Sequence, residues 1–171
     1  MRDPVVLFGA FDRHNFGDML FPHVAAALLA GRQLVFAGLA ERDLRGHGGH
    51  RVRALAAVAA EFGQRPVHLV HVGGEILTCD AWQAAVMLST PDTVQDTIAR
   101  LEGRPRERLA WAREMLGIDA HAPYTVARAQ FPCIARVSHA AVGGVELDGC
   151  EPALRDEGLA KLAAADHLGV R

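Results

Sequence analysis

Short apolar runs that alternate with helical segments constrain the fold of this chain more than any other feature. The runs "PVVLFGA" (4–10), "QLVFAGL" (33–39) and "RPVHLVHVGGE" (65–75) are typical of buried strands. The segments between them, 18–31 and 50–63, carry apolar residues at helical spacing. Strands and helices that alternate in this way predict βαβ units and a parallel sheet.

The rest of the chain extends this pattern after a long helical stretch. The segment 80–117 is predicted to be helical throughout, and a strand is expected over 134–142. A helix is expected over 151–166, followed by a strand over 167–171. We therefore predict an α/β fold: one Rossmann-like domain over 1–171, with a parallel sheet, helices on both faces and a helical insertion at about 80–117.

The first two predicted helices lead to expectations about single residues, namely which of them face the core and where each helix begins. In the first helix, Leu20, Val24 and Leu28 recur at helical spacing and are expected to face the core. Pro22 is expected in the first turn of that helix, where its missing N–H costs nothing. The second helix is expected to begin at His50, directly after a glycine-rich loop.

The composition excludes several classes of protein. The chain has 171 residues and a net charge of −2, and its arginines are scattered, so no nucleic-acid-binding surface is predicted. No apolar run approaches the ~20 residues of a membrane span. The three cysteines form no C-x-x-C pair and no secretory signal is present, which indicates reduced thiols in the cytoplasm. The nine histidines form no H-x-x-x-H or H-E-x-x-H pair, so no metal site is expected.

Polar residues and glycines follow the first and third predicted strands, at the sheet edge where ligands of parallel sheets bind. Asn15 or Asp18 alone could cap the next helix, and Arg13, His14 or Glu75 alone could lie exposed on a loop. Together they predict one ligand crevice, because glycines permit close backbone approach and a helix N-terminus attracts anions. The candidate residues are Gly9, Arg13, His14, Asn15, Gly17 and Asp18 in the first loop, and Gly73, Gly74 and Glu75 in the second.

The first of these loops resembles the N-terminal motif of the polysaccharide pyruvyl transferase family. In that family a strand ends at a glycine, and Asn-x-Gly-Asp opens the first helix after a short polar loop. The corresponding residues here are Gly9, Asn15, Gly17 and Asp18.

Two further segments resemble later markers of the same family, in the same order along the chain. "HLVHVGGEILTCD" (68–80) is similar to a strand that ends in a glycine run, with Glu75 where a third glycine often stands. "LAKLAAADHLGVR" (159–171) is similar to a helix followed by a strand ending in Val-Arg-Asp, and it stops at Arg171. The resemblance therefore covers essentially the whole chain.

This resemblance implies the N-terminal half of a GT-B-like, two-domain enzyme whose C-terminal domain is absent from this chain. Such enzymes transfer the pyruvyl group of phosphoenolpyruvate to the hydroxyls of a sugar or glycan acceptor, without a further cofactor. Asp18 and Glu75 are then expected to be catalytic, and Arg13 and His14 are expected to bind an anionic group. The donor-binding residues are expected in the missing domain, so the isolated chain is expected to be inactive.

Two other interpretations fit the same residues. The chain could be a non-catalytic Rossmann-like module that binds a small anion or a sugar. It could also be an interaction domain in which the segment 80–117 docks a partner. In the two-domain interpretation, the face that docks the missing domain would be an exposed apolar patch, which would favour a homodimer of the isolated half. Cys79 is expected to be a buried thiol, and Trp82 and Trp111 are expected to pack between helices.

Overall fold

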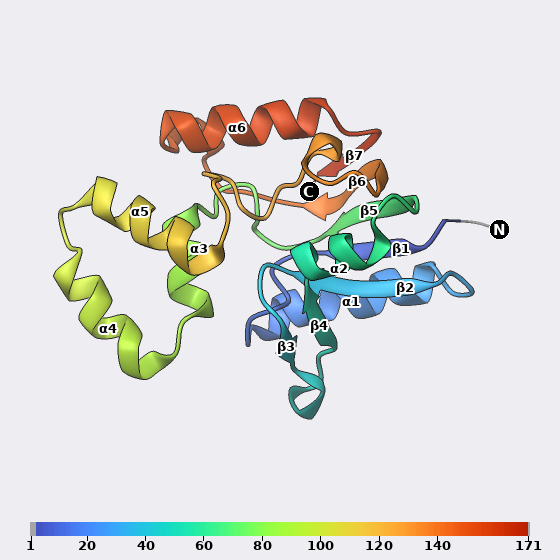
Figure 1. The fold of residues 1–171 in the computed structure, drawn as a ribbon, viewed down its shortest axis with the longest axis horizontal. Helices are drawn as coiled ribbons and strands as arrows, with labels where there is room; N and C mark the ends of the chain where they lie inside the picture. The colour runs from blue at the N-terminus through green and yellow to red at the C-terminus, as the bar shows by residue number, and fades with distance from the viewer. Residues whose placement is uncertain (1–2, 171) are drawn as a thin grey trace.

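A mostly parallel sheet organises the molecule. The computed structural model describes residues 3–170, whose strands form one seven-stranded sheet in the order β3-β4-β2-β1-β5-β6-β7 (Figure 1). The paired strands run parallel, except that β3 pairs with β4 in the antiparallel direction. The strands are β1 (Val5–Phe8), β2 (Leu34–Gly38), β3 (Arg42–Asp43), β4 (Arg51–Ala54), β5 (Val67–Val72), β6 (Ile134–Val142) and β7 (His167–Val170). The predicted α/β fold is confirmed at this level; Arg171 lies outside the described residues.

Helices cover both faces of the sheet. The helices of the described residues are α1 (Phe16–Leu28), α2 (Leu55–Phe62), α3 (Ala81–Leu88), α4 (Pro91–Arg100), α5 (Pro105–Leu116) and α6 (Pro152–Ala163). Of these, α1 covers one face, and α2 and α6 cover the other. Successive strand residues point to opposite faces, so β1 contributes to two separate cores. Val5 and Leu7 pack on the side of α1, whereas Val6 and Phe8 pack on the side of α2 and α6. The sheet is therefore a layer between two helical layers, as predicted.

The helix α1 differs from its sequence prediction in orientation. It begins at Phe16, so Pro22 lies inside the helix rather than in its first turn. Pro22 and Met19 are buried, whereas Leu20, Val24 and Leu28 are 47%, 59% and 81% exposed. The prediction that these three residues face the core is wrong. The side of this helix that packs on the sheet carries Phe21 and Ala25, with Leu29 at its C-cap, and Met19 and Pro22 are buried on the same helix.

The second predicted helix is shorter than expected. Residues Arg51–Ala54 form β4, and α2 begins only at Leu55. Val52 is fully buried, and β4 pairs with β2 and with the short strand β3, which was not predicted from the sequence. Sheet pairing outweighs helix propensity here, because β4 lies between β2 and the edge strand β3.

The helical stretch after β5 is confirmed and lies beyond the strand ends. In Figure 1, α3, α4 and α5 lie to the left of the sheet, at the ends that β1 and β5 point toward. Asp80 caps α3 through a capping box with Gln83. The rings of Trp82 and Trp111 pack edge to face at 5.2 Å between α3 and α5, as expected for inter-helix packing. Within residues 3–170, no helix is both long and apolar enough to cross a membrane.

Candidate functional site

The two predicted loops meet at the carboxyl ends of β1 and β5. These strands are neighbours in the sheet, and the chain leaves β1 toward β2 on one side and reaches β5 on the other. The strand order therefore reverses between them, which makes this edge the topological switch point of the sheet. The glycine-rich loop after β5 and the polar loop after β1 form the two sides of one crevice at this edge.

The Gly73–Gly74 pair brings the β5 loop against the start of α1. Both glycines have positive φ, +59° and +78°. A Cβ at Gly73 would lie 2.1 Å from Cγ of Phe21, and one at Gly74 would lie 3.1 Å from Oδ1 of Asp18. Both positions thus need glycine for backbone conformation, and Gly73 also needs it for close approach. The two glycines therefore allow the second loop to pack closely against α1.

Asn15 and Asp18 organise the N-terminus of α1. The backbone N–H of Asp18 donates to Oδ1 of Asn15 at 3.2 Å, so Asn15 is the N-cap of the helix. Asp18 is 8% exposed and lies in the first turn, where its charge is stabilised by the helix dipole. A Cβ added at Gly17 would lie 3.4 Å from Oδ1 of Asn15, an ordinary contact distance. The Asn-x-Gly-Asp motif is thus a compact cap that also presents a carboxylate toward the second loop.

Arg13 is the cation at the centre of the crevice. Its Nε donates to Oδ2 of Asp18 at 3.0 Å, and its Nη2 pairs with the same oxygen at 2.9 Å. The guanidinium also lies 6.0 Å from the ring centroid of Tyr124. Burial opposes the charge of Arg13, but the Asp18 carboxylate, with further contributions from Tyr124 and Cys79, outweighs burial and raises the pKa of the guanidinium. Arg13 therefore stays charged in a half-buried position.

A buried carboxylate that the sequence did not single out anchors this arrangement. Asp12 is fully buried and accepts a hydrogen bond from the Tyr124 hydroxyl at 2.8 Å. Its other oxygen accepts from the backbone N–H groups of Leu39 and Ala40 at 2.6 and 3.0 Å. Burial raises the pKa of Asp12, against the lowering effect of these hydrogen bonds. Asp12 thus ties the ends of β1 and β2 to the segment that contains Tyr124.

Gly38 makes room for that carboxylate, since a Cβ there would lie 2.5 Å from Cβ of Asp12. Gly9 has a similar role on the other side of β1, where a Cβ would lie 3.0 Å from the carbonyl oxygen of Val72. The predicted ligand residue Gly9 thus belongs to the backbone packing under the crevice. Because Gly9 has no side chain, the first loop can lie close to the end of β5.

Hollows surround Arg13 on several sides. One, of about 620 Å³, is lined by Arg13, His14, Asn15 and Arg42, which gives it cationic and amide groups. A second, of about 360 Å³, lies between Arg13, Glu75 and α3. A third, of about 590 Å³, lies between Glu75 and the outer side of α1. Arg13 borders all of these hollows, so one ligand could occupy the crevice and reach more than one of them.

Glu75 is the exposed carboxylate of the site. It lines the hollows on both sides of Arg13, and its Oε1 accepts from Thr78 Oγ1 and from the Val145 backbone N–H, each at 3.3 Å. These bonds fix the side chain but leave it open to solvent. Cys79 lies nearby but is only 5% exposed, and burial raises the pKa of its thiol to about 12. The prediction of a buried thiol is confirmed.

The structure brings together most of the predicted residues and adds others. His14 stands apart from Asp18 and Glu75, because its ring packs 4.4 Å from that of His47 at the outer rim. Asp12 and Arg42 complete the site, and Tyr124 lies more than a hundred residues further along the chain. Only the position of Asp12 inside the first loop offered a sequence signal for any of them. Among residues 3–170, no group of three His, Cys, Asp or Glu side chains could hold a metal ion.

The arrangement suits recognition of an anion beside a hydroxyl-bearing ligand. Arg13, Arg42 and the N-terminus of α1 supply positive charge and N–H donors on one side. Glu75 supplies a carboxylate that can accept a hydroxyl proton on the other. Searches against family models, curated proteins and solved structures found no match to this chain.

Proposed function

We propose that the chain is the acceptor-side Rossmann-like half of a polysaccharide pyruvyl transferase-like enzyme of the cytoplasm. The observation that supports this most is the convergence of its two characteristic loops. Asp18 of the Asn-x-Gly-Asp motif faces Gly74 of the glycine pair, and Glu75 follows directly on the same crevice. If the two motifs belong to one site, they must lie close together in space. The Asn-x-Gly-Asp motif and the glycine pair lie close together in this way.

In the proposed reaction, two hydroxyls of the sugar replace the phosphate of phosphoenolpyruvate. C3 of the enol gains a proton, both sugar oxygens bond to C2, and the bond between C2 and the phosphate oxygen breaks. The two hydroxyl protons balance the step, one supplying C3 and one leaving with phosphate. Glu75 acts as the base for a hydroxyl, because its carboxylate is exposed and carries no ion pair among the described residues.

Asp18 has a different role from Glu75 in this proposal. Its Oδ2 is already paired with Arg13, so it positions the guanidinium rather than removing a proton. Arg13, His14 and Arg42 face the hollow that would receive the carboxylate or phosphate of an anionic substrate. The remaining donor-binding groups come from a second domain in a GT-B-like arrangement.

The test is phosphate release from phosphoenolpyruvate by the full-length gene product with a panel of sugar acceptors. Glu75→Gln should lower kcat at least a hundredfold, within the range of a lost general base. Glu114→Gln is the matched control, because Glu114 is exposed on α5 without a partner among the described residues. Release that is absent from the wild type, or equal in both variants, contradicts the proposal, as does a gene that ends at Arg171.

A non-catalytic module that binds a small anion or sugar is the second candidate. The Arg13–Asp18 ion pair favours it, since a carboxylate held by an arginine is suited to fixing a ligand-binding cation. This candidate predicts that phosphoenolpyruvate binds with equal affinity to the wild type and to Glu75→Gln, and that no phosphate is released. Calorimetric titration together with the release assay separates the two candidates.

Self-association belongs to the same proposal. Phe16, Leu20, Val24 and Leu28 follow one another along the solvent side of α1, and Phe16 is 74% exposed. An apolar row of this kind on a helix is normally covered. We expect the isolated chain to dimerise through α1, and Leu20→Glu to shift it toward monomer in sedimentation velocity runs. A chain that is monomeric at 100 μM would contradict this.

A further inference from the structure

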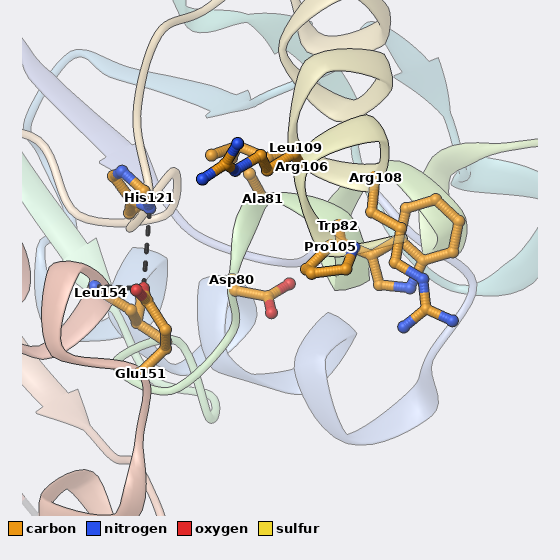
Figure 2. Close-up of a pocket in the computed structure, with 10 residues that line it drawn as sticks. All are labelled: Asp80, Ala81, Trp82, Pro105, Arg106, Arg108, Leu109, His121, Glu151 and Leu154. Atoms are coloured by element: carbon orange, nitrogen blue, oxygen red, sulfur yellow. Dashed lines mark hydrogen bonds and ion pairs between the residues drawn. The ribbon is translucent and has the colours of Figure 1, made fainter. Parts of the chain in front are cut away.

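A cavity next to the candidate site has the composition of a sugar-binding pocket. It has a volume of about 340 Å³ and lies between the helical segment and the start of α6. Figure 2 shows Asp80, Trp82 and Pro105 on one side and His121, Glu151 and Leu154 on the other, with Arg106 reaching between them. The volume falls in the range of small-molecule sites.

The lining combines apolar walls with hydrogen-bonding groups of both kinds. Trp82, Pro105, Leu109 and Leu154 supply apolar surface. The charged and polar side chains of the lining are two carboxylates, two guanidinium groups and one imidazole: Asp80, Glu151, Arg106, Arg108 and His121. A sugar ring has apolar C–H faces and hydroxyls that both donate and accept, so it can use every group in this set.

The balance of charge argues against an ionic ligand. The carboxylates of Asp80 and Glu151 would repel an anion, and the guanidinium groups of Arg106 and Arg108 would repel a cation. A neutral polyhydroxyl ligand meets neither penalty. The cavity is thus electrostatically suited to an uncharged sugar.

Arg106 is the group best placed to bind such a ligand. It makes no hydrogen bond or ion pair with the residues the structure describes, whereas Arg108 is held by the Leu101 carbonyl at 2.9 Å and by the Trp82 ring at 5.1 Å. Glu151 caps α6 through Leu154 and lies 3.8 Å from His121. The free guanidinium at the rim can therefore bind a hydroxyl without breaking an existing contact.

The first turn of α3 connects this cavity to the candidate site. Trp82 lines both the cavity and the hollow that contains Arg13 and Glu75. The capping box joins Asp80 in the cavity to Gln83 in the hollow, with hydrogen bonds of 2.7 and 3.1 Å. A chain of linked sugars could therefore run from Glu75 across this turn.

We propose that the cavity binds a neutral sugar unit of the acceptor glycan, adjacent to the unit that reacts at Glu75. This inference rests on the proposed function for its reacting unit, but not for sugar binding itself. It predicts that acceptors of two or more units bind better than single sugars, because only they reach both places.

The test is a titration of the full chain with cellobiose, lactose and maltose, and with glucose and galactose, followed by ¹H–¹⁵N NMR. Trp111→Phe assigns the indole N–H signal of Trp82. We expect at least one disaccharide to shift this signal, and Arg106→Ala to raise its Kd about tenfold, the effect of losing one hydrogen bond to a charged group. Arg100→Ala is the matched control, since Arg100 is an exposed arginine outside the cavity.

The outcomes separate this inference from the proposed function, because the titration contains no phosphoenolpyruvate. No shift of the Trp82 indole at 20 mM of any disaccharide would overturn the inference, as would an Arg106→Ala Kd equal to that of the wild type. Disaccharide binding without phosphate release by the full-length product would overturn the proposed function and leave the sugar site standing.

Discussion

Asp12 illustrates how one buried side chain positions the cation beside it. It receives three hydrogen bonds, from Tyr124, Leu39 and Ala40, and directly precedes Arg13. Because buried polar groups cost free energy unless they are paired, this network holds three segments in one arrangement. The geometry of the crevice therefore depends in part on Tyr124, Leu39 and Ala40, which line none of the three hollows beside Arg13.

Tyr124→Phe tests this network without changing side-chain volume much. It leaves one oxygen of the buried Asp12 carboxylate without its donor, so the free energy of unfolding should fall by about 1–3 kcal/mol. Urea denaturation measures the change. Thr97→Val is the control, because it removes an exposed hydrogen bond on α4 and should cost less than ~0.5 kcal/mol. Equal effects of the two substitutions would contradict the buried network.

Gly73 offers a second test at the residue scale. Gly73→Ala adds both a strained backbone conformation and a contact with the Phe21 ring, whereas Gly117→Ala at φ +66° adds only the strain, since its Cβ would meet open space. The strain costs about 1–2 kcal/mol. Overpacking should add about 1–3 kcal/mol at Gly73. Matching midpoints in thermal denaturation for the two variants would contradict the close approach of the β5 loop to α1.

At the scale of elements, α1 shows where sequence periodicity reaches its limit. Leu20, Val24 and Leu28 form one apolar row, and Met19 and Pro22 lie on another. A helix that is apolar all round does not reveal its buried side, because the period alone fits either row. The packing of the first turn decides it, since Asp18 must face Arg13 and the second loop.

Paired lysine substitutions test the orientation of α1. Met19 is 4% exposed and Val24 is 59% exposed. Met19→Lys buries a charge and should cost at least ~3 kcal/mol or prevent folding, whereas Val24→Lys should change the free energy of unfolding of the monomer by less than ~0.5 kcal/mol. Circular dichroism with urea titration measures both. Unfolding by Val24→Lys together with tolerance of Met19→Lys would contradict this orientation.

The strands β5 and β6 carry a buried histidine pair that couples stability to pH. His71 and His139 stack with ring centroids 4.0 Å apart, and both are nearly inaccessible. His71 accepts from the Val126 N–H through Nε2, so its proton is on Nδ1 and points to the Ser138 carbonyl. Neither ring nitrogen of His139 has a partner among the described residues. Burial lowers the pKa of His71 well below its usual value and that of His139 to about 4.

This pair predicts destabilisation in mild acid. Between the unfolded pKa near 6.5 and about 4, the unfolded chain binds protons that the folded chain excludes, so stability is complete above pH 6.5 and falls as pH drops. The slope should reach about 1.4 kcal/mol per pH unit for each histidine. His139→Leu should flatten the profile between pH 6.5 and 4, and His167→Gln, on the exposed strand β7, should not. An unchanged profile for His139→Leu would contradict the buried neutral pair.

At the scale of the whole molecule, the sequence predicted the long strands and the meeting of the two loops better than the short strands and the orientation of α1. A strand that is buried on both faces has a short, nearly continuous apolar sequence. The strands β1, β2, β5 and β6 were predictable for this reason. The short strands β3 and β4 were not, because pairing at a sheet edge determines them more than composition. Asp12 and Tyr124 could not be paired from sequence, since their contact depends on the path of the chain between them.

The molecule thus presents a crevice at the switch point of its sheet, with an adjoining cavity between the helical segment and the start of α6 (Figure 2). Arg13 and Glu75 line the crevice, and Trp82 lines both the crevice and the cavity. This layout agrees with a domain that holds an extended acceptor along the strand ends. In the function proposed above, pyruvyl transfer takes place in this crevice.

The most direct test of this account is to map sugar binding on the backbone of the chain by NMR. During titration with the same disaccharides, the amide signals of Asn15, Gly73 and Gly74 should shift together, and Glu75→Gln should weaken that binding while Glu114→Gln leaves it unchanged. Shifts confined to other parts of the chain, with these three amides unaffected at saturation, would contradict the assignment of the crevice as the acceptor site.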